Sequence, residues 1–415
     1  MASHSETKKI VIVGGGIIGA TSAYYLTRHP SFNSSKHSIT LLEASTIAGG
    51  ASGKAGGLLA RWAYPSSLVP LSYELHAQLA HEHGGEERWG YRTLHCGSVE
   101  CKGNHLPSKT EGRNGDVDQL HHVSLEKKGG QERKAPMSTK DVPEDLDWLD
   151  EGCLRSYDPM GDPSTTAQVH PFQFTTSMAT LAEEKGAQIK TGAKVSKINY
   201  TSDGSSVESV TYESGGKVET IPATDIVIAA GPWTQRIYQS APITALRAHS
   251  VTIRPAKPVS AYALFTEIKL PSDFARLKSR GSQIVSPEIY TRPGNEIYAC
   301  GDGDRLVPLP SLSSEVEVDQ SRCQDIIDYV SSISGALRDG EVTARQACYL
   351  PNVNAPGSGG PLIGLTGVNG EVMAAGHTCW GIQNGPGTGK LVSEFVFDGE
   401  AKSANIAALD PRIVL

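Results

Sequence analysis

The sequence has few of the features that mark secreted, membrane-spanning or nucleic-acid-binding proteins. No apolar run reaches membrane-spanning length, and residues 1–9 lack the apolar core of a secretory signal. Asp and Glu (45) outnumber Lys and Arg (38), and no basic cluster is present, which argues against nucleic acid or an anionic membrane as a partner. These absences predict a protein of the cytoplasm.

The sequence has few cysteines, and none of them are spaced as CxxC pairs. An odd number of cysteines without a CxxC pair predicts free thiols, no disulfide framework and no metal site. The seven cysteines are Cys96, Cys101, Cys153, Cys300, Cys323, Cys348 and Cys379.

The chain of 415 residues is long enough to form more than one hydrophobic core. Chains beyond about 250 to 300 residues usually divide into domains, and ligand sites often lie between them. We therefore expect two domains with a cofactor cleft between them. Residues 103–140 are polar and show no periodicity, so a surface insertion or partly disordered loop is expected there.

The first segment of the chain has the pattern strand, turn, helix, strand. Residues 9–13 (KIVIV) are a β-branched apolar run, GGGIIG follows at 14–19, and apolar residues then recur at helical spacing up to Pro30. Residues 38–43 (SITLLE) predict a second strand that ends on Glu43. This spacing predicts a βαβ unit of the dinucleotide-binding type.

The conserved spacing of such a unit gives each of its glycines a separate role. Gly14 permits the tight turn, Gly16 lets the backbone reach a pyrophosphate, and Gly19 lets helix and strand pack closely. Glu43 would accept hydrogen bonds from ribose hydroxyls. A glycine-rich turn can also be purely structural, but the strand, the helix and the acid around this one favour a dinucleotide. The turn alone does not distinguish NAD from FAD.

Four further segments point to a known family. They are 47–64 (IAGGASGKAGGLLARWAY), 170–198, 225–235 (DIVIAAGPWTQ) and 370–390 (GEVMAAGHTCWGIQNGPGTGK). With the N-terminal unit they resemble the D-amino-acid-oxidase superfamily of FAD-dependent oxidoreductases, nearest its sarcosine-oxidase and glycine-oxidase branch. The resemblance implies an α/β fold, in which a Rossmann-type FAD-binding domain is interleaved with an α+β substrate domain built on an antiparallel sheet.

The same resemblance implies how the chain divides. Residues 1–80, 155–240 and 342–415 would form the FAD-binding domain, and residues 81–154 and 241–341 the substrate domain. The substrate domain has candidate strands rich in β-branched and aromatic residues, and a Pro-Gly-Asn turn predicts a hairpin between the last two. These strands are 249–255, 260–268, 288–293 and 295–301.

The resemblance also implies which residues contact FAD. A helix that begins near Thr388 would aim its N-terminal dipole at the N1–C2=O edge of the flavin, where negative charge accumulates on reduction. The expected FAD-binding residues are Gly14, Gly16, Ile17, Ile18, Gly19, Glu43, Ala44, Ser52, Lys54, Ala55, Gly56, Gly57, Leu58, Val195, Ala230, Gly231, Trp233, Cys348, Gly376, His377, Trp380, Gly381, Gly385, Gly387, Thr388 and Gly389.

The activity that the resemblance implies is oxidation of a C–N bond in a small amine or amino acid. A hydride passes to flavin N5 and oxygen takes the electrons to give hydrogen peroxide, so the protein chiefly positions the substrate. An amino-acid carboxylate would need an arginine; Arg61 is the first candidate and Arg292 the second, with a salt-bridge role open for Arg61. Tyr290, Tyr298 and Trp380 would line the substrate cavity.

The sequence departs from the family pattern at several positions. Leu350–Pro351 stands where glycine oxidases have an Arg-Pro step, and Tyr298 stands at the place of the oxygen-activating lysine. Asp302 and Asp304 could hold a cationic amine or form a polar turn. Two alternatives therefore stay open: a dehydrogenase that uses another electron acceptor, and a flavoprotein that serves as an assembly or trafficking factor without turnover.

Cys348 falls at or next to the position where sarcosine oxidases of this family bind FAD through a thioether. The resemblance therefore implies FAD that is either covalently attached through Cys348 or held without a bond. A buried structural cysteine is the alternative, and Cys379 is a second candidate for attachment.

Overall fold

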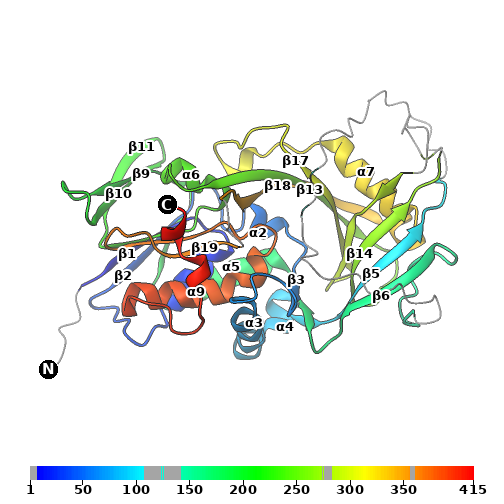
Figure 1. Ribbon diagram of the computed structural model, residues 1–415, viewed down its shortest axis with the longest axis horizontal. Coiled ribbons are helices and arrows are strands. Elements are labelled where there is room, and N and C mark those ends of the chain that lie inside the picture. Colours follow the sequence, from blue (N-terminus) through cyan, green and yellow to red (C-terminus); the bar gives the residue numbers. More distant parts are fainter. Residues whose placement is uncertain are drawn as a thin grey trace.

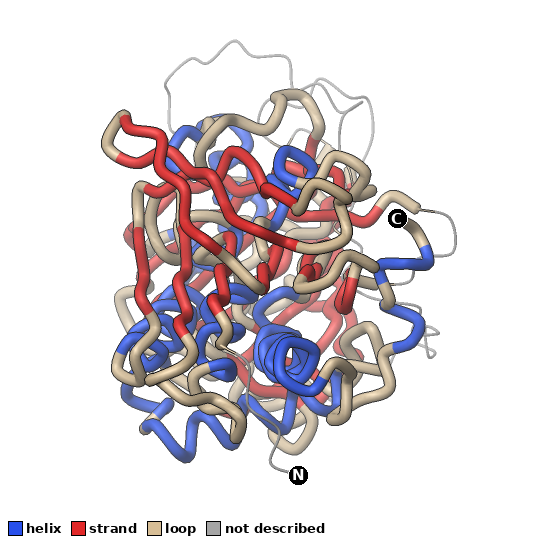
Figure 2. The backbone as a smooth tube through the Cα atoms, turned by 90° about the vertical axis from the view of Figure 1, so that its left-hand side faces the viewer, coloured by secondary structure: helices blue, strands red, loops and turns tan. Residues whose placement is uncertain are grey.

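The computed structural model describes residues 7–106, 123, 125, 142–272, 274, 283–355 and 360–415. The expected insertion at 103–140 lies almost wholly outside these residues. The molecule is elongated, with helices packed on a parallel sheet at one end and a large antiparallel sheet at the other (Figure 1). Figure 2 views it along the long axis, with most helices below the strands. Within the described ranges, no helix combines the length and apolarity that a bilayer crossing requires.

A six-stranded sheet forms the centre of the first half. Its strand order is β19-β20-β12-β1-β2-β8, and every neighbouring pair is parallel except β19 with β20. The Rossmann-type arrangement that the sequence predicts is therefore confirmed. The strands are β1 Lys9–Val13, β2 Ser38–Leu42, β8 Gln188–Lys190, β12 Asp225–Ile228, β19 Leu362–Leu365 and β20 Glu371–Ala375.

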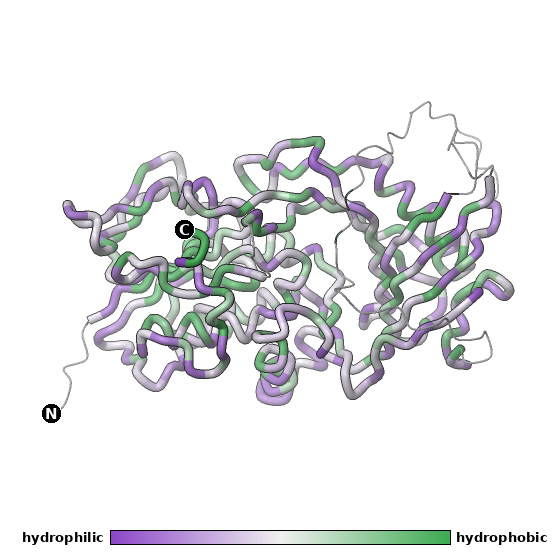
Figure 3. The backbone as a smooth tube through the Cα atoms, viewed as in Figure 1, coloured by the Kyte–Doolittle hydropathy of each residue, from purple (hydrophilic) through white to green (hydrophobic). Residues whose placement is uncertain are grey.

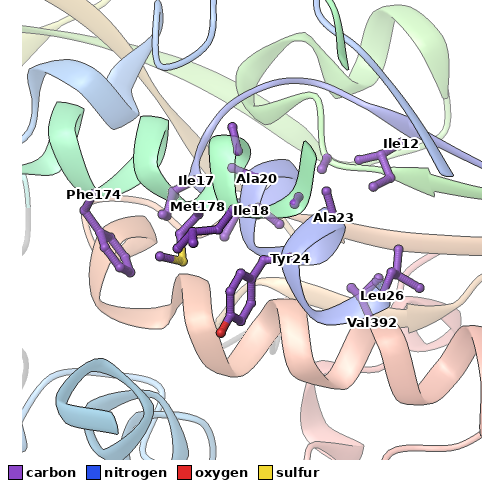
Figure 4. Packing of buried hydrophobic residues seen from close by; sticks show 14 of the residues in the cluster. Ile12, Ile17, Ile18, Ala20, Ala23, Tyr24, Leu26, Phe174, Met178 and Val392 are labelled. Carbon is purple, nitrogen blue, oxygen red and sulfur yellow. The ribbon is translucent and has the colours of Figure 1, made fainter. Parts of the chain in front are cut away.

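Both faces of this sheet are covered, as the continuous apolar runs of its strands require. In β1, Ile10 and Ile12 pack with the helices, whereas Val11 and Val13 pack with a three-stranded antiparallel sheet on the other face. Figure 4 shows the helical side, where side chains from three helices meet. These helices are α1 Ile17–Leu26, α5 Pro171–Glu183 and α9 Gly381–Asp398, and the small sheet is β9 Ala193–Tyr200, β10 Val207–Ser214 and β11 Lys217–Pro222.

Helix α1 lies closer to the preceding turn than a side chain would allow. A Cβ atom at Gly19 would lie 1.9 Å from the carbonyl oxygen of Gly14. Gly14 has a φ angle of +106°, and a Cβ atom there would lie 2.5 Å from the carbonyl oxygen of Ala229. Both positions require glycine, as the spacing of the turn predicts.

The second half is built on an eight-stranded sheet. Its order is β18-β13-β17-β16-β14-β5-β6, with β15 paired to β14, and only β14 with β5 is parallel. Hydropathy alternates along strands such as β5, where Val99 is buried and Glu100 exposed (Figure 3). The strands are β5 His95–Lys102, β6 Leu154–Gly161, β13 Ile243–Arg254, β14 Tyr262–Lys269, β15 Ile284–Val285, β16 Glu288–Arg292, β17 Glu296–Asp304 and β18 Glu341–Val353.

The predicted hairpin between the last two candidate strands is confirmed. Strands β16 and β17 are antiparallel, and the turn between them places Gly294 and Asn295 at φ angles of +77° and +57°. The two domain boundaries stay a prediction. The remaining elements are α2 Ala51–Lys54, β3 Leu58–Ala60, α3 Val69–His83, α4 Gly85–Trp89, β4 Arg92–Thr93, β7 Thr166–Gln168, η3 Gly231–Trp233, α6 Thr234–Ile237, η4 Ser313–Glu315, α7 Gln320–Ser331, α8 Gly335–Arg338, η5 Ala407–Leu409 and η6 Pro411–Ile413.

Helix α9 begins earlier than the sequence predicts. The expected start near Thr388 is wrong, because the helix already begins at Gly381 and contains Pro386. Glycine and proline indicate a turn when the sequence is considered alone, but tertiary packing overrides their low helix propensity. A Cβ atom at Gly389 would lie 2.5 Å from the backbone carbon of Thr21, so this glycine allows α9 to pack against α1.

The proline in α9 is accommodated by a histidine from α3. Pro386 has no N–H group to donate to the carbonyl of Ile382, one helical turn earlier. The Nε2 atom of His76 lies 3.0 Å from that carbonyl oxygen and takes the place of the missing donor. Burial lowers the pKa of His76 to about 4, so the ring is neutral at physiological pH.

We predict that Gly389→Ala lowers the free energy of unfolding by about 2 kcal/mol, because the added methyl group forces α9 away from α1. Denaturant unfolding followed by circular dichroism measures this. Gly381→Ala on the same helix is the matched control, since its Cβ atom would have no neighbour nearer than 3.7 Å. Equal effects of the two substitutions would contradict the packing argument.

Candidate functional site

One large cavity runs along the carboxyl ends of the parallel strands and continues to the antiparallel sheet. It contains about 1710 Å³ of space not filled by protein, its open mouth included. Its wall includes Val13 and Leu42 from β1 and β2, and Tyr298 and Cys348 from β17 and β18.

The carboxylate of Glu43 is held by backbone amides at the end of β2. Its Oε2 atom accepts a hydrogen bond from the amide of Gly15 at 2.7 Å, and its Oε1 atom accepts one from the amide of Ser45 at 2.8 Å. A carboxylate keeps further lone pairs after these two bonds. Glu43 is therefore a fixed acceptor at the place where a dinucleotide-binding unit binds ribose hydroxyls.

The backbone is bare where the fingerprint places the phosphates. A Cβ atom at Gly231 would meet no atom within 4 Å, and one at Gly16 would meet only the Oγ atom of Ser52, at 3.1 Å. Ser52 also accepts a hydrogen bond from the first amide of α1, that of Ile17, at 2.9 Å. Bare backbone, a helix N-terminus and an adjacent acid together fit a bound dinucleotide.

The other end of the cavity is apolar and aromatic. The rings of Tyr290 and Tyr298 stack with centroids 5.8 Å apart and planes 8° from parallel. A Cβ atom at Gly56 would lie 2.0 Å from the ring of Tyr290, so the small-residue segment can pass this wall only with glycine there. Trp380 completes the wall at 3% exposure, perpendicular to the ring of Trp62 at 5.6 Å.

Lys54 and Cys348 lie side by side on the cavity wall. The Nζ atom of Lys54 donates a hydrogen bond to the carbonyl oxygen of Ala347 at 2.9 Å, which places the ammonium next to Cys348. Burial lowers the pKa of Lys54, and the neighbouring thiol opposes that shift. The pair therefore combines a cysteine with a partly desolvated cation on the cavity wall.

His377 lines the cavity as a neutral ring. It is 3% exposed, and its Nε2 atom lies 3.0 Å from the Oγ1 atom of Thr388. Burial lowers its pKa to about 3. The N-terminus of α9 follows directly, with Trp380 as its cap and Gly381 on the cavity wall, so the positive end of that helix dipole points at the cavity.

The structure brings most of the predicted site residues to this one cavity. Those that line it are Gly14, Gly16, Ile17, Ile18, Glu43, Ala44, Ser52, Lys54, Ala55, Gly56, Gly57, Leu58, Val195, Ala230, Gly231, Trp233, Tyr290, Tyr298, Cys348, Gly376, His377, Trp380 and Gly381.

Some expected cofactor residues are not on the wall. Gly19 lies beneath the turn, against Gly14. Gly385, Gly387 and Gly389 face α1 and α3, because the earlier start of α9 places them inside the helix. Thr388 is buried and its hydroxyl meets His377. These residues support the wall instead of forming it.

Arg61 is not brought to the cavity. Its side chain is exposed, and its guanidinium carbon lies 5.0 Å from the ring centroid of Tyr73 on α3. The position of Arg61 in the ARWAY motif does not show to which side its side chain turns. We therefore do not assign it a carboxylate-binding role.

Arg292 is also engaged elsewhere. Its Nη1 atom pairs with Glu296 at 2.8 Å, and its Nη2 atom donates to the carbonyl oxygen of Ala55. Its guanidinium carbon lies 4.8 Å from the ring centroid of Tyr298. Arg292 thus fixes the small-residue segment against the antiparallel sheet, and a carboxylate would have to displace Glu296 to bind it.

Asp304, a candidate for binding a cationic amine, is buried in an ion-pair cluster. It is 0% exposed, pairs with Arg247 at 3.1 Å and lies 3.5 Å from the Nε atom of Arg322. Asp302 is exposed. Both residues lie within strand β17, so the predicted polar turn around Gly303 is wrong, and the ion pairs of Asp304 leave it unavailable to an amine.

Several lining residues were not predicted. Gly49, Gly50 and Lys194 are sequence neighbours of predicted residues, so the same motifs could have included them. Residues 311–313 come from the connection between β17 and α7, and no local pattern marks them.

Comparisons with known proteins agree with this geometry. The family model described as "DAO: FAD dependent oxidoreductase" matches residues 9–395. A protein of Saccharomyces cerevisiae named "Putative oxidoreductase TDA3" is 36% identical to this chain over an aligned length of 512 residues. The alignment covers 99% of this chain and 96% of the yeast protein.

Solved structures show the same fold. Glycine oxidase from Geobacillus kaustophilus matches with a TM-score of 0.69 and 21% identity over 97% of this chain and 98% of its own. L-Proline dehydrogenase from P. horikoshii matches with a TM-score of 0.67 and 18% identity over 98% of this chain and 97% of its own.

We predict that buried neutral His377 makes stability depend on pH. Its pKa is about 3 when folded and 6.5 in the reference state, so the unfolded chain binds the extra proton between these values and stability falls as the pH drops below 6.5. His377→Asn should reduce the slope of unfolding free energy against pH by up to about 1.4 kcal/mol per pH unit in this window. Denaturant titrations from pH 7.5 to 4.5 measure it; an unchanged slope would show that the ring is charged or solvated.

Proposed function

The chain belongs to the DAO family of FAD-dependent oxidoreductases, and on that premise we propose that it oxidises the C–N bond of a small amine. Bound FAD supplies the acceptor for the hydride at N5, and oxygen takes the electrons to give hydrogen peroxide. The observation that carries the proposal is the single cavity that joins a dinucleotide end to a buried aromatic wall.

The aromatic wall supports an amine as substrate. Tyr290, Tyr298 and Trp380 line the cavity at 2%, 5% and 3% exposure, so a molecule bound against this wall loses part of its water. Aromatic faces attract alkylammonium groups, and their rigidity orients a bound C–H bond with little loss of side-chain entropy. Among the described residues, the Nε1–H group of Trp380 is buried and has no hydrogen-bond partner.

We favour an amine without a carboxylate over an α-amino acid. Arg61 points to solvent beside Tyr73, and Arg292 is paired with Glu296. The solved neighbours are named for glycine and L-proline as substrates, which supports C–N oxidation as the reaction class for this chain. Those names include both an oxidase and a dehydrogenase.

A second candidate concerns the electron acceptor. Tyr298, which stands where the family resemblance expects an oxygen-activating lysine, is buried and stacked on Tyr290. Its ring supplies no cation to stabilise reduced oxygen. This favours a dehydrogenase with another acceptor as the alternative to the oxidase.

The function is tested by anaerobic mixing with primary, secondary and tertiary amines, each beside its α-carboxylated counterpart. We expect an amine to bleach the flavin absorbance, and faster than its carboxylated counterpart. Admission of air should then give one peroxide per flavin; bleaching without peroxide would favour the dehydrogenase. If no amine or amino acid bleached the flavin, the proposal would be wrong and a non-catalytic assembly or trafficking role would be favoured.

We further predict that Trp380→Phe slows this flavin reduction about tenfold, because the smaller ring leaves a gap in the cavity wall and loosens substrate orientation. Trp148→Phe is the matched control, since Trp148 is equally buried but its Nε1 atom bonds Ser260 in the other core. Stopped-flow absorbance gives both rates. Equal rates in the two variants would remove Trp380 from the substrate wall.

We also propose that Cys348 attaches the flavin through a thioether, because it lines the cavity beside the cation of Lys54. The thiol S–H and a C–H of a flavin ring methyl would be lost, and the two electrons would pass through the flavin to oxygen. Acid denaturation of the wild type should leave the yellow colour on the polypeptide, and Cys348→Ala should release it as free FAD. Free flavin from the wild type, or retained colour in Cys348→Ala, would refute this attachment. Cys379→Ala, at the same cavity, is the control and should retain the colour.

A further inference from the structure

A segment from the second half of the chain closes the ribose end of the cavity. Residues 307–313, here called the strap, connect β17 to η4 and α7. Ser311, Leu312 and Ser313 line the same cavity as Glu43. The strap thus reaches the dinucleotide end of the cavity although it belongs to the connection that follows the antiparallel sheet.

One edge of the strap is linked through Ser45 to the carboxylate of Glu43. The hydroxyl groups of Ser45 and Ser313 lie 2.5 Å apart, and the amide of Ser45 donates to Glu43 at 2.8 Å. On β9, the Nζ atom of Lys194 donates to the Oγ atom of Ser311 at 3.0 Å. The hydroxyl group of Ser313 is therefore separated by one residue, Ser45, from Glu43, the acid expected to bind ribose.

The other edge is tied through its backbone carbonyls. The Nε1 atom of Trp233 donates to Pro310 at 2.8 Å, and Arg236 donates to Leu309 at 2.6 Å. These donors lie in η3 and α6, directly after the Ala-Gly turn at the cavity.

A third anchor lies outside the cavity. The hydroxyl group of Tyr349 on β18 lies 2.8 Å from the carbonyl oxygen of Val307 and 3.1 Å from that of Pro308. Tyr349 is 2% exposed and is not part of the cavity wall, whereas its neighbour Cys348 is. Removal of this hydroxyl therefore loosens the strap without altering any group that touches the cofactor space.

We propose that the strap is a cofactor-binding element that retains the adenosine half of FAD. Five donors or hydroxyls from β9, α6, η3, β18 and the 43–45 segment hold seven residues that have little regular structure of their own. Pro308 and Pro310 restrict the strap further, so little ordering entropy is lost when it covers a ligand. The strap must open before FAD leaves, and the rate of FAD release therefore depends on these anchors.

The test measures release of FAD from the holoprotein in a Cys348→Ala background, where no covalent bond can hide dissociation. Release is followed as the rise of flavin fluorescence after dilution. Tyr349→Phe should accelerate release about five- to tenfold, the factor expected for one net hydrogen bond, and the double variant Tyr349→Phe, Ser313→Ala should accelerate it further. The matched control is Tyr262→Phe, which loses a buried hydroxyl bonded to Asp145 in the other core and should change release less than about twofold.

Thermal unfolding of the apoproteins separates retention from general stability. Faster release with apoprotein melting temperatures equal to that of Tyr262→Phe supports the strap. Unchanged release rates in both strap variants would overturn the proposal. It would also be overturned if release rose only in proportion to a loss of melting temperature that the control shares. This outcome depends on bound FAD alone and not on the identity of the amine substrate.

Discussion

The contact between α1 and the turn before it sets the position of everything at the dinucleotide end. A Cβ atom at position 19 would lie only 1.9 Å from the carbonyl oxygen of Gly14. Because Gly19 has none, the helix can begin directly after the carboxyl end of β1. The first amide of the helix then donates a hydrogen bond to the hydroxyl group of Ser52, and the amide of Gly15 donates one to the carboxylate of Glu43. A methyl group at Gly19 would move the helix N-terminus and the acid apart.

Glycine also allows close packing at two other contacts around the site. Gly389 brings α9 against α1, so that the N-terminus of α9 opens onto the cavity, and Gly56 lets the small-residue segment pass the ring of Tyr290. Arg292 then fixes that segment to the antiparallel sheet through the carbonyl of Ala55. At both contacts a glycine allows the two walls of the cavity to approach closely.

The features that short sequence patterns predicted correctly are those that depend on neighbouring residues. The βαβ unit followed from an apolar run, three spaced glycines and Glu43, and the hairpin at Gly294 and Asn295 followed from its turn residues. The start of α9 could not be predicted locally, because the packing of Gly389 on Thr21 and the His76 bond to Ile382 come from elements distant in sequence. Likewise, neither the outward turn of the Arg61 side chain nor the approach of residues 311–313 leaves a mark in the neighbouring residues.

We propose that one FAD molecule spans the cavity with its ring against the aromatic wall. The excited-state lifetime of the bound flavin tests this most directly, because a tryptophan or tyrosine in contact quenches the excited ring by electron transfer. We expect a short lifetime in the wild-type protein and a longer one in Trp380→Leu, with one flavin bound per chain in both. A lifetime equal to that of free FAD, unchanged by the substitution, would place the flavin ring away from this wall and refute the proposed placement.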